Sequence, residues 1–141
     1  MIDWQAVLDF AARQHPAAVH FPIALILSGA LLELLICLHR REDWMAAQRF
    51  CLRFGAWMAL VAAALGWTLA GSMESSGELN LHRWLGVAAT AAALVTAFLV
   101  PRWPESERRV FRWVLTLTAM VIALTGHFGG YLVHGPAQFT G

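Results

Sequence analysis

Histidines are the side chains of this sequence with the greatest scope for chemistry. Five of the six fall near the same ends of the long apolar runs of the chain, and only His39 lies at the opposite ends. The five are His15, His20, His82, His127 and His134. Ionisable groups in membrane spans are costly and usually functional. Imidazole ligates haem iron, copper and zinc, so we expect a cofactor or metal site.

Four apolar runs must position these histidines, at 17–38, 54–71, 81–100 and 110–133. Each is long enough to cross a hydrocarbon core of about 30 Å, which takes roughly 20 helical residues. The chain is 59% hydrophobic and 13% charged, and helix is the only spanning structure for such runs. Short connections make neighbouring helices antiparallel. The sequence therefore predicts an all-α, integral membrane, four-helix up-down-up-down bundle, formed as one domain by residues 1–141.

The N-terminal segment carries apolar side chains at helical spacing, at Trp4, Val7, Leu8 and Ala11. This pattern predicts a short helix that lies in the membrane interface. The alternative is a frayed polar tail. The segment lacks the basic start, apolar stretch and cleavage site of a signal peptide.

The arginines predict the orientation of the bundle. The chain has ten arginines and no lysine. Only Arg13 and Arg83 lie on the side of the histidine cluster. The other eight lie in or beside the connections between spans one and two and between spans three and four: Arg40, Arg41, Arg49, Arg53, Arg102, Arg108, Arg109 and Arg112. Since cytoplasmic loops collect arginine, we expect a multi-pass protein of the bacterial cytoplasmic membrane with both termini on the outer, periplasmic side.

The first histidine segment contains two prolines. Pro16 suits the first helical position and favours an extended conformation for His15. Pro22 has no N–H for the Ala18 carbonyl, so the turn should be distorted in a way that aims His20 inward. The alternative is a proline-initiated helix with an interfacial histidine.

The third span begins with a second histidine segment. Asn80 is a plausible N-cap and would place His82 in the first turn. Gly86 lies one turn farther along the same face, where it would let a flat ligand approach the backbone or would merely allow close helix packing. Arg83 and Arg13 are the outward arginines, and haem propionates would need such partners.

The last span ends with a glycine-rich histidine segment. His127 and His134 are seven residues apart, so they share a helical face within about 20° and differ in depth by roughly 10 Å. Gly135-Pro136 ends the helix, which makes His127 the deepest of the outer histidines. Gly130 and the other glycines nearby suit a broad, flat ligand. The alternatives are a structural role for His127 and stabilisation of the helix end by His134.

These three segments resemble a widespread bacterial four-span domain of unknown function. The resemblance covers nearly the whole chain, and the segment around His127 is its most specific part. The family is similar to domains fused to Rieske iron–sulfur proteins, to cytochrome c modules and to quinoprotein dehydrogenases of the sorbosone type. The resemblance therefore implies redox work at the outer face.

We expect a b-type cytochrome-like subunit that binds one or two haem b groups, rather than a stand-alone enzyme. His20 and His127 would be the deep ligands, and His82 and His134 a second pair. The subunit would link a periplasmic dehydrogenase or cytochrome c with the quinone pool. It would contact membrane lipid and have no nucleic-acid partner, and it could form an oligomer. One alternative is copper or zinc bound by the outer histidines, His15 included, and another is a structural membrane anchor.

One carboxylate lies near the inner end of a span. We expect Glu33 to pair with an inner-face arginine such as Arg109 or Arg53, rather than to relay protons.

Overall fold

A computed structural model describes residues 2–39, 42–100 and 108–135 of the 141-residue chain. The described residues contain helices and no strand. The helices are α1 (Trp4–Ala12), α2 (His15–Ala18), α3 (His20–His39), a 3-10 turn η1 (Glu42–Trp44), α4 (Met45–Gly71), α5 (Gly77–Leu99) and α6 (Arg108–His134). Four segments are long and apolar enough to span a membrane: His15–His39, Met45–Gly71, Gly77–Leu99 and Arg108–Val133. The predicted four-span bundle is confirmed.

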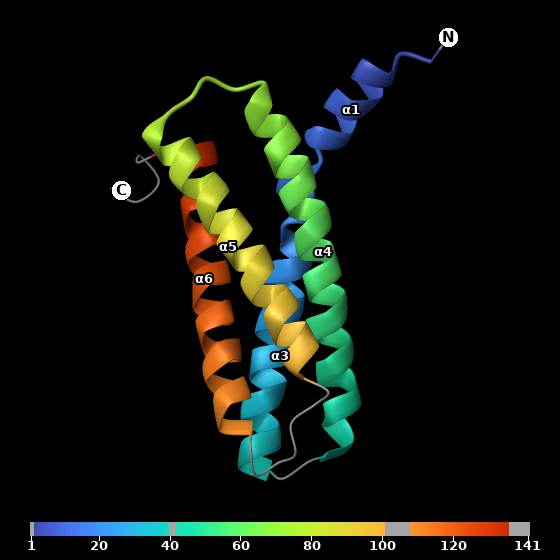
Figure 1. Ribbon diagram of the computed structural model, residues 1–141, viewed down its shortest axis with the longest axis vertical. Helices are drawn as coiled ribbons and strands as arrows, with labels where there is room; N and C mark the ends of the chain where they lie inside the picture. Colours follow the sequence, from blue (N-terminus) through green and yellow to red (C-terminus); the bar gives the residue numbers. More distant parts are fainter. Residues whose placement is uncertain (1, 40–41, 101–107, 136–141) are drawn as a thin grey trace.

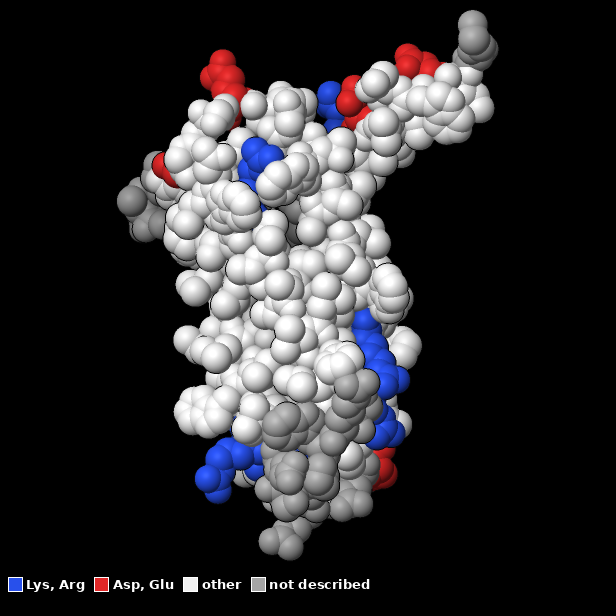
Figure 2. Space-filling view, in the orientation of Figure 1, with Lys and Arg blue, Asp and Glu red and all other residues white. Residues whose placement is uncertain are grey.

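The long helices form a ring. Each helix from α3 to α6 contacts its neighbour in sequence, and α6 also contacts α3, so the bundle closes with up-down-up-down order (Figure 1). We call the end with the α4–α5 connection the histidine end, and the opposite end the arginine end. Figure 2 shows basic side chains gathered at the arginine end and acidic ones around the histidine end, separated by an uncharged zone. Arg40, Arg41 and Arg102 lie outside the described residues.

The helix α1 extends away from the bundle at the histidine end (Figure 1). The Asp3 carboxylate caps it by accepting hydrogen bonds from the backbone N–H groups of Gln5 and Ala6. Its apolar side chains, Trp4 and Leu8 among them, are exposed. The predicted N-terminal helix is therefore confirmed, and its place in a membrane interface stays a prediction.

Two predicted helix starts are wrong. The N-cap of α5 is Ser76 rather than Asn80, since its hydroxyl accepts the Leu79 N–H at 3.1 Å, and His82 consequently lies in the second turn. His15 is the first residue of α2 instead of an extended residue before it. The helix breaks at Val19, between α2 and α3, because Pro22 cannot donate to the Ala18 carbonyl. That predicted distortion is confirmed.

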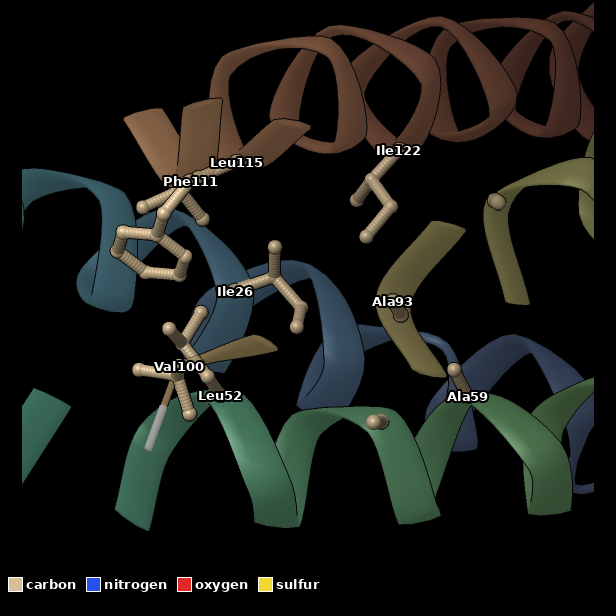
Figure 3. Close-up of a cluster of buried hydrophobic side chains, with 10 residues drawn as sticks. Ile26, Leu52, Ala59, Ala93, Val100, Phe111, Leu115 and Ile122 are labelled. Carbon is tan, nitrogen blue, oxygen red and sulfur yellow. The ribbon is translucent and has the colours of Figure 1, made fainter. Parts of the chain in front are cut away.

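The core is built from small and branched side chains. Gly29 of α3 leaves room for Leu52 of α4, whose Cδ2 would lie 2.5 Å from an added Cβ, and Gly55 accepts Ile26 in the same way at 3.0 Å. Small residues allow this close helix packing in membranes. In Figure 3, Ile26 and Leu52 lie close to Val100, which follows α5, and to Phe111 and Leu115 of α6.

A buried ionic network joins three helices at the arginine end. Glu33 of α3 accepts hydrogen bonds from Arg108 and Arg112 of α6 and, at 2.8 Å, from the Gln48 amide of α4. The Arg108 and Glu33 side chains are only 4% and 6% exposed. The prediction of an inner-face arginine partner is confirmed, but the partners named, Arg109 and Arg53, were wrong. Arg108 lies on the buried stripe of α6, so its guanidinium reaches inward.

Candidate functional site

A cavity of about 430 Å³ opens at the histidine end, between α2, α3, α4, α5 and α6. Most of its lining is aliphatic, with the polar side chains of His15, His20, His82 and Arg83 at its wall. Ligand pockets in proteins are typically about 300–1,000 Å³ and mostly apolar, with a few polar groups. The cavity therefore has the size and character of a small-molecule or cofactor site.

His15 is held against α4. Its ring is half-buried, and its Nδ1 lies 2.9 Å from the Ala62 carbonyl oxygen. Because a carbonyl can only accept, Nδ1 carries the proton, which leaves Nε2 free to act as an acceptor or metal ligand in the neutral ring. Gly66 makes room for the ring, since an added Cβ would lie 2.6 Å from the His15 Cε1.

His82 of α5 also lines the cavity, close to His15. The two ring centres are 6.3 Å apart, with the planes at 71°. The His82 ring packs against Gly129 of α6, where an added Cβ would lie 2.9 Å from the His82 Cε1. The His82 Nδ1 is buried and has no hydrogen-bond partner among the described residues. Buried polar atoms without partners are rare in native proteins, so this nitrogen is available to a ligand or a water molecule.

Arg83 completes the polar wall beside His82. Its guanidinium carbon lies 4.1 Å from the centre of the Trp67 ring, in a cation–π contact. The Arg83 Nε is buried, and the described part of the chain offers it no hydrogen-bond partner. A cation with an unused donor is thus placed at the cavity.

The other predicted site residues are not all brought together. His20 lines the cavity but is exposed. Gly86 and Gly130 also line it, and an added Cβ at either glycine would meet nothing within 4 Å. Arg13 is exposed and does not line the cavity.

His127 departs from the expectation of a deep, inward-facing histidine. It is exposed and is not part of the cavity wall, and its ring contacts the Phe128 ring edge-on at 5.9 Å. Thr125 and Gly129 lie two residues, or about 200°, from His127 and line the cavity, as do Gly126 and Gly130. The structure therefore does not bring His127 into the cavity beside His20.

His134 is the last residue of α6, and its side chain is outside the described part of the structure. The following Gly135 has φ +68°, the left-handed conformation that commonly ends helices. The predicted helix end is confirmed at Gly135, whereas Pro136 lies beyond the described residues.

The metal-binding potential of the site rests on two imidazoles. No group of three or more His, Cys, Asp or Glu able to hold a metal ion occurs within residues 2–39, 42–100 and 108–135. The pairing of His15 with His82, and the place of Gly66 behind it, were not singled out from the sequence. The available signal was Gly66 itself, since a glycine inside a span can leave room for a side chain of another helix.

The comparisons with known proteins bear on the fold and not on a ligand. No curated protein and no solved structure matches the chain. A family described as "Predicted membrane protein (DUF2231)" matches residues 13–135, which include α2 to α6 and every residue of the cavity wall named above. With four candidate spans arranged as one helical bundle, the chain belongs to the DUF2231 family of predicted membrane proteins.

Proposed function

We propose that this protein is a membrane electron-transfer subunit that binds haem b at the histidine end. The observation that carries the proposal is the pair of half-buried imidazoles, His15 and His82, which come from different helices and meet at one apolar cavity. Imidazole is a standard axial ligand of haem iron, and helix bundles commonly hold cofactors between facing helices.

The spacing of the two rings supports His15 and His82 as the ligand pair, in place of His20 with His127. A metal–imidazole bond is about 2.0–2.1 Å long, so two imidazoles that held one metal ion would have to lie close together. The observed separation is 6.3 Å. The Ala62 carbonyl would fix the orientation of the His15 ring and raise its basicity, as outer-shell partners of ligating histidines do.

The remaining wall suits a flat, anionic-edged cofactor. Gly86 and Gly130 present open backbone to the cavity, where a broad ring system could lie against the helices. Arg83, with its unused Nε, would bind a propionate through a charge-assisted hydrogen bond. Arg13 has no such role, because it does not line the cavity.

When bound, haem iron supplies reversible one-electron chemistry. The arginine end would face the cytoplasm by the positive-inside rule, so the site would open to the periplasm, together with both termini. A periplasmic dehydrogenase or cytochrome c would then be the redox partner on that side, with the quinone pool in the membrane as the other.

A single copper or zinc ion is the second candidate, because the two imidazoles could also ligate it. His15 and His82 supply only two ligands, and no third His, Cys, Asp or Glu joins them among the described residues. Haem needs just two axial ligands from the protein. A bare metal ion would not need the open space beside Gly86 and Gly130. The geometry therefore favours haem.

Absorption spectra with metal analysis test the proposal. The protein is produced with haem supply, purified in detergent, and compared with the His15→Ala, His82→Ala and His39→Ala variants. We expect a reducible Soret and α-band spectrum and stoichiometric iron in the wild type. His15→Ala and His82→Ala should each lose or convert the low-spin spectrum, and His39→Ala, at the other end of α3, should keep it.

The outcomes separate the candidates. Copper or zinc without a porphyrin spectrum would replace haem by an ion site, provided that the same two histidines are required. Wild-type protein with neither metal nor porphyrin would refute both proposals and leave a structural anchor.

A further inference from the structure

A second recess lies on the outer surface of α4, near the arginine end and far from the histidines. It has a volume of about 420 Å³ and is lined by six residues of this one helix: Ala46, Arg49, Phe50, Arg53, Phe54 and Trp57. In Figure 2, basic side chains lie along the edge of the bundle over α4. The recess thus combines two guanidinium groups with three aromatic side chains.

We propose that this recess binds an anionic phospholipid, with its phosphate between Arg49 and Arg53 and an acyl chain along the aromatic side chains. The proposal is independent of haem binding at the other end. Guanidinium groups bind phosphate through paired, charge-assisted hydrogen bonds. Basic sites at the membrane surface of a protein are characteristic of anionic lipid recognition.

The two arginines lie on one face of α4 and have no acidic partner in the part of the chain that the structure describes. They are four residues apart, which places neighbouring side chains on the same face. The ion pairs of the described residues involve neither of them. The first turn of α4 also contains no acidic residue. Like charges at this spacing destabilise a helix, and an anion between them would remove that repulsion.

The depth of the arginines matches the position of lipid phosphates. The apolar run of α4 begins at Phe54 and continues through residue 71, about 27 Å of helix at 1.5 Å per residue. Because that length is close to the hydrocarbon thickness of about 30 Å, Arg53 lies at the boundary and Arg49 lies one turn farther out.

Phe54 and Trp57 continue the recess into the hydrocarbon, and Phe50 lies between the two arginines. Phe50 and Trp57 are 63% and 67% exposed, and the Phe50 and Phe54 rings stack with their centres 5.6 Å apart. They form a wall that no other described residue covers, so it faces the lipid around the bundle. A diacyl lipid would bury this wall, which a free phosphate ion would not, so we commit to the lipid as the occupant.

The test is lipid binding by native mass spectrometry of the purified chain in neutral detergent. Phosphatidylglycerol and phosphatidylcholine are titrated separately. The variants are Arg49→Gln, Arg53→Gln, their combination, and Arg109→Gln as a matched control that removes one exposed charge from α6 near the same end. At about 1 kcal/mol per arginine near the membrane surface, each α4 variant should weaken phosphatidylglycerol binding about 5-fold and the double variant about 30-fold.

We expect phosphatidylcholine to bind more weakly than phosphatidylglycerol, Arg109→Gln to behave as the wild type, and excess inorganic phosphate not to displace the lipid. Equal affinity for both lipids, or an equal loss in Arg109→Gln and in the α4 variants, would overturn the site. Displacement by inorganic phosphate would show an ion site and refute the lipid. The arginines contribute little to the packed core, and unfolding temperatures in phosphatidylcholine should confirm that all variants fold.

Discussion

Replacing Glu33 by glutamine probes the ionic network at the arginine end with the smallest change in shape. The two carboxylate oxygens accept four hydrogen bonds. Arg108 Nε and Arg112 Nε donate to Oε1 at 3.2 and 2.9 Å, while Gln48 Nε2 and the Arg108 Nη2 donate to Oε2. Glutamine has one acceptor oxygen and one NH₂ group. In either rotamer, two of the four donors would face that NH₂ group.

The expected loss of stability follows from burial. Leaving a buried donor unsatisfied costs about 1–3 kcal/mol, so two such donors cost roughly 2–6 kcal/mol. Removing one partner of a buried ion pair costs about 3–5 kcal/mol, because the remaining charge stays buried. Glu33 and Arg108 are nearly inaccessible. We therefore expect Glu33→Gln to lower the free energy of unfolding by about 3–5 kcal/mol.

The assay is reversible unfolding in mixed micelles, followed by far-ultraviolet circular dichroism, in the wild type, Glu33→Gln and Glu74→Gln. Glu74 lies exposed in the α4–α5 connection, so Glu74→Gln removes the same charge without breaking a network and should change stability by less than about 0.5 kcal/mol. A loss below about 1 kcal/mol in Glu33→Gln would mean that the network is solvated, and the reasoning would be wrong.

Three further changes have defined outcomes. His127→Ala should leave haem and metal content at the wild-type level, because His127 lies outside the cavity; a loss of haem would return it to the ligand set. Arg83→Gln should weaken haem retention about 10-fold or more through loss of a charge-assisted bond, whereas Arg13→Gln should not, and equal retention in both variants would exclude the propionate role. Gly29→Ala should destabilise the bundle by about 1–3 kcal/mol in the same unfolding assay, because its Cβ would lie 2.5 Å from Leu52 Cδ2; unchanged stability would contradict that packing.

The number and order of the spans could be predicted because a hydropathy profile gives the length of each apolar run, which can be compared with the thickness of the bilayer. The helix limits were less accessible. The helix of the second span begins at Met45 instead of 54. Its residues before 54 include the polar Gln48, Arg49 and Arg53, so they do not belong to the apolar run from which the span was predicted. These residues are suited to the lipid headgroup region and to the buried ionic network. A hydropathy profile does not predict either environment.

The predicted histidines lie at the end of the bundle that holds the cavity, but the structure brings His15 and His82 to its wall and leaves His127 outside it. In a membrane helix, lipid and protein sides are both apolar, so the period of 3.6 residues separates them poorly. Two residues turn a helix by about 200°, so His127 cannot face the same way as Thr125 and Gly129. The burial of His15 depends on the contact between α2 and α4, which no local pattern encodes.

The network around Glu33 has a consequence for how the protein is made. Its carboxylate belongs to α3, and both of its arginine partners belong to α6, which is synthesised later. Before α6 is made, the Gln48 amide of α4 is its one partner among the described residues. A carboxylate left unpaired in a membrane costs several kcal/mol. Insertion of α6 therefore both closes the helical ring and pairs the buried carboxylate, and a bundle truncated before α6 would keep an unpaired Glu33.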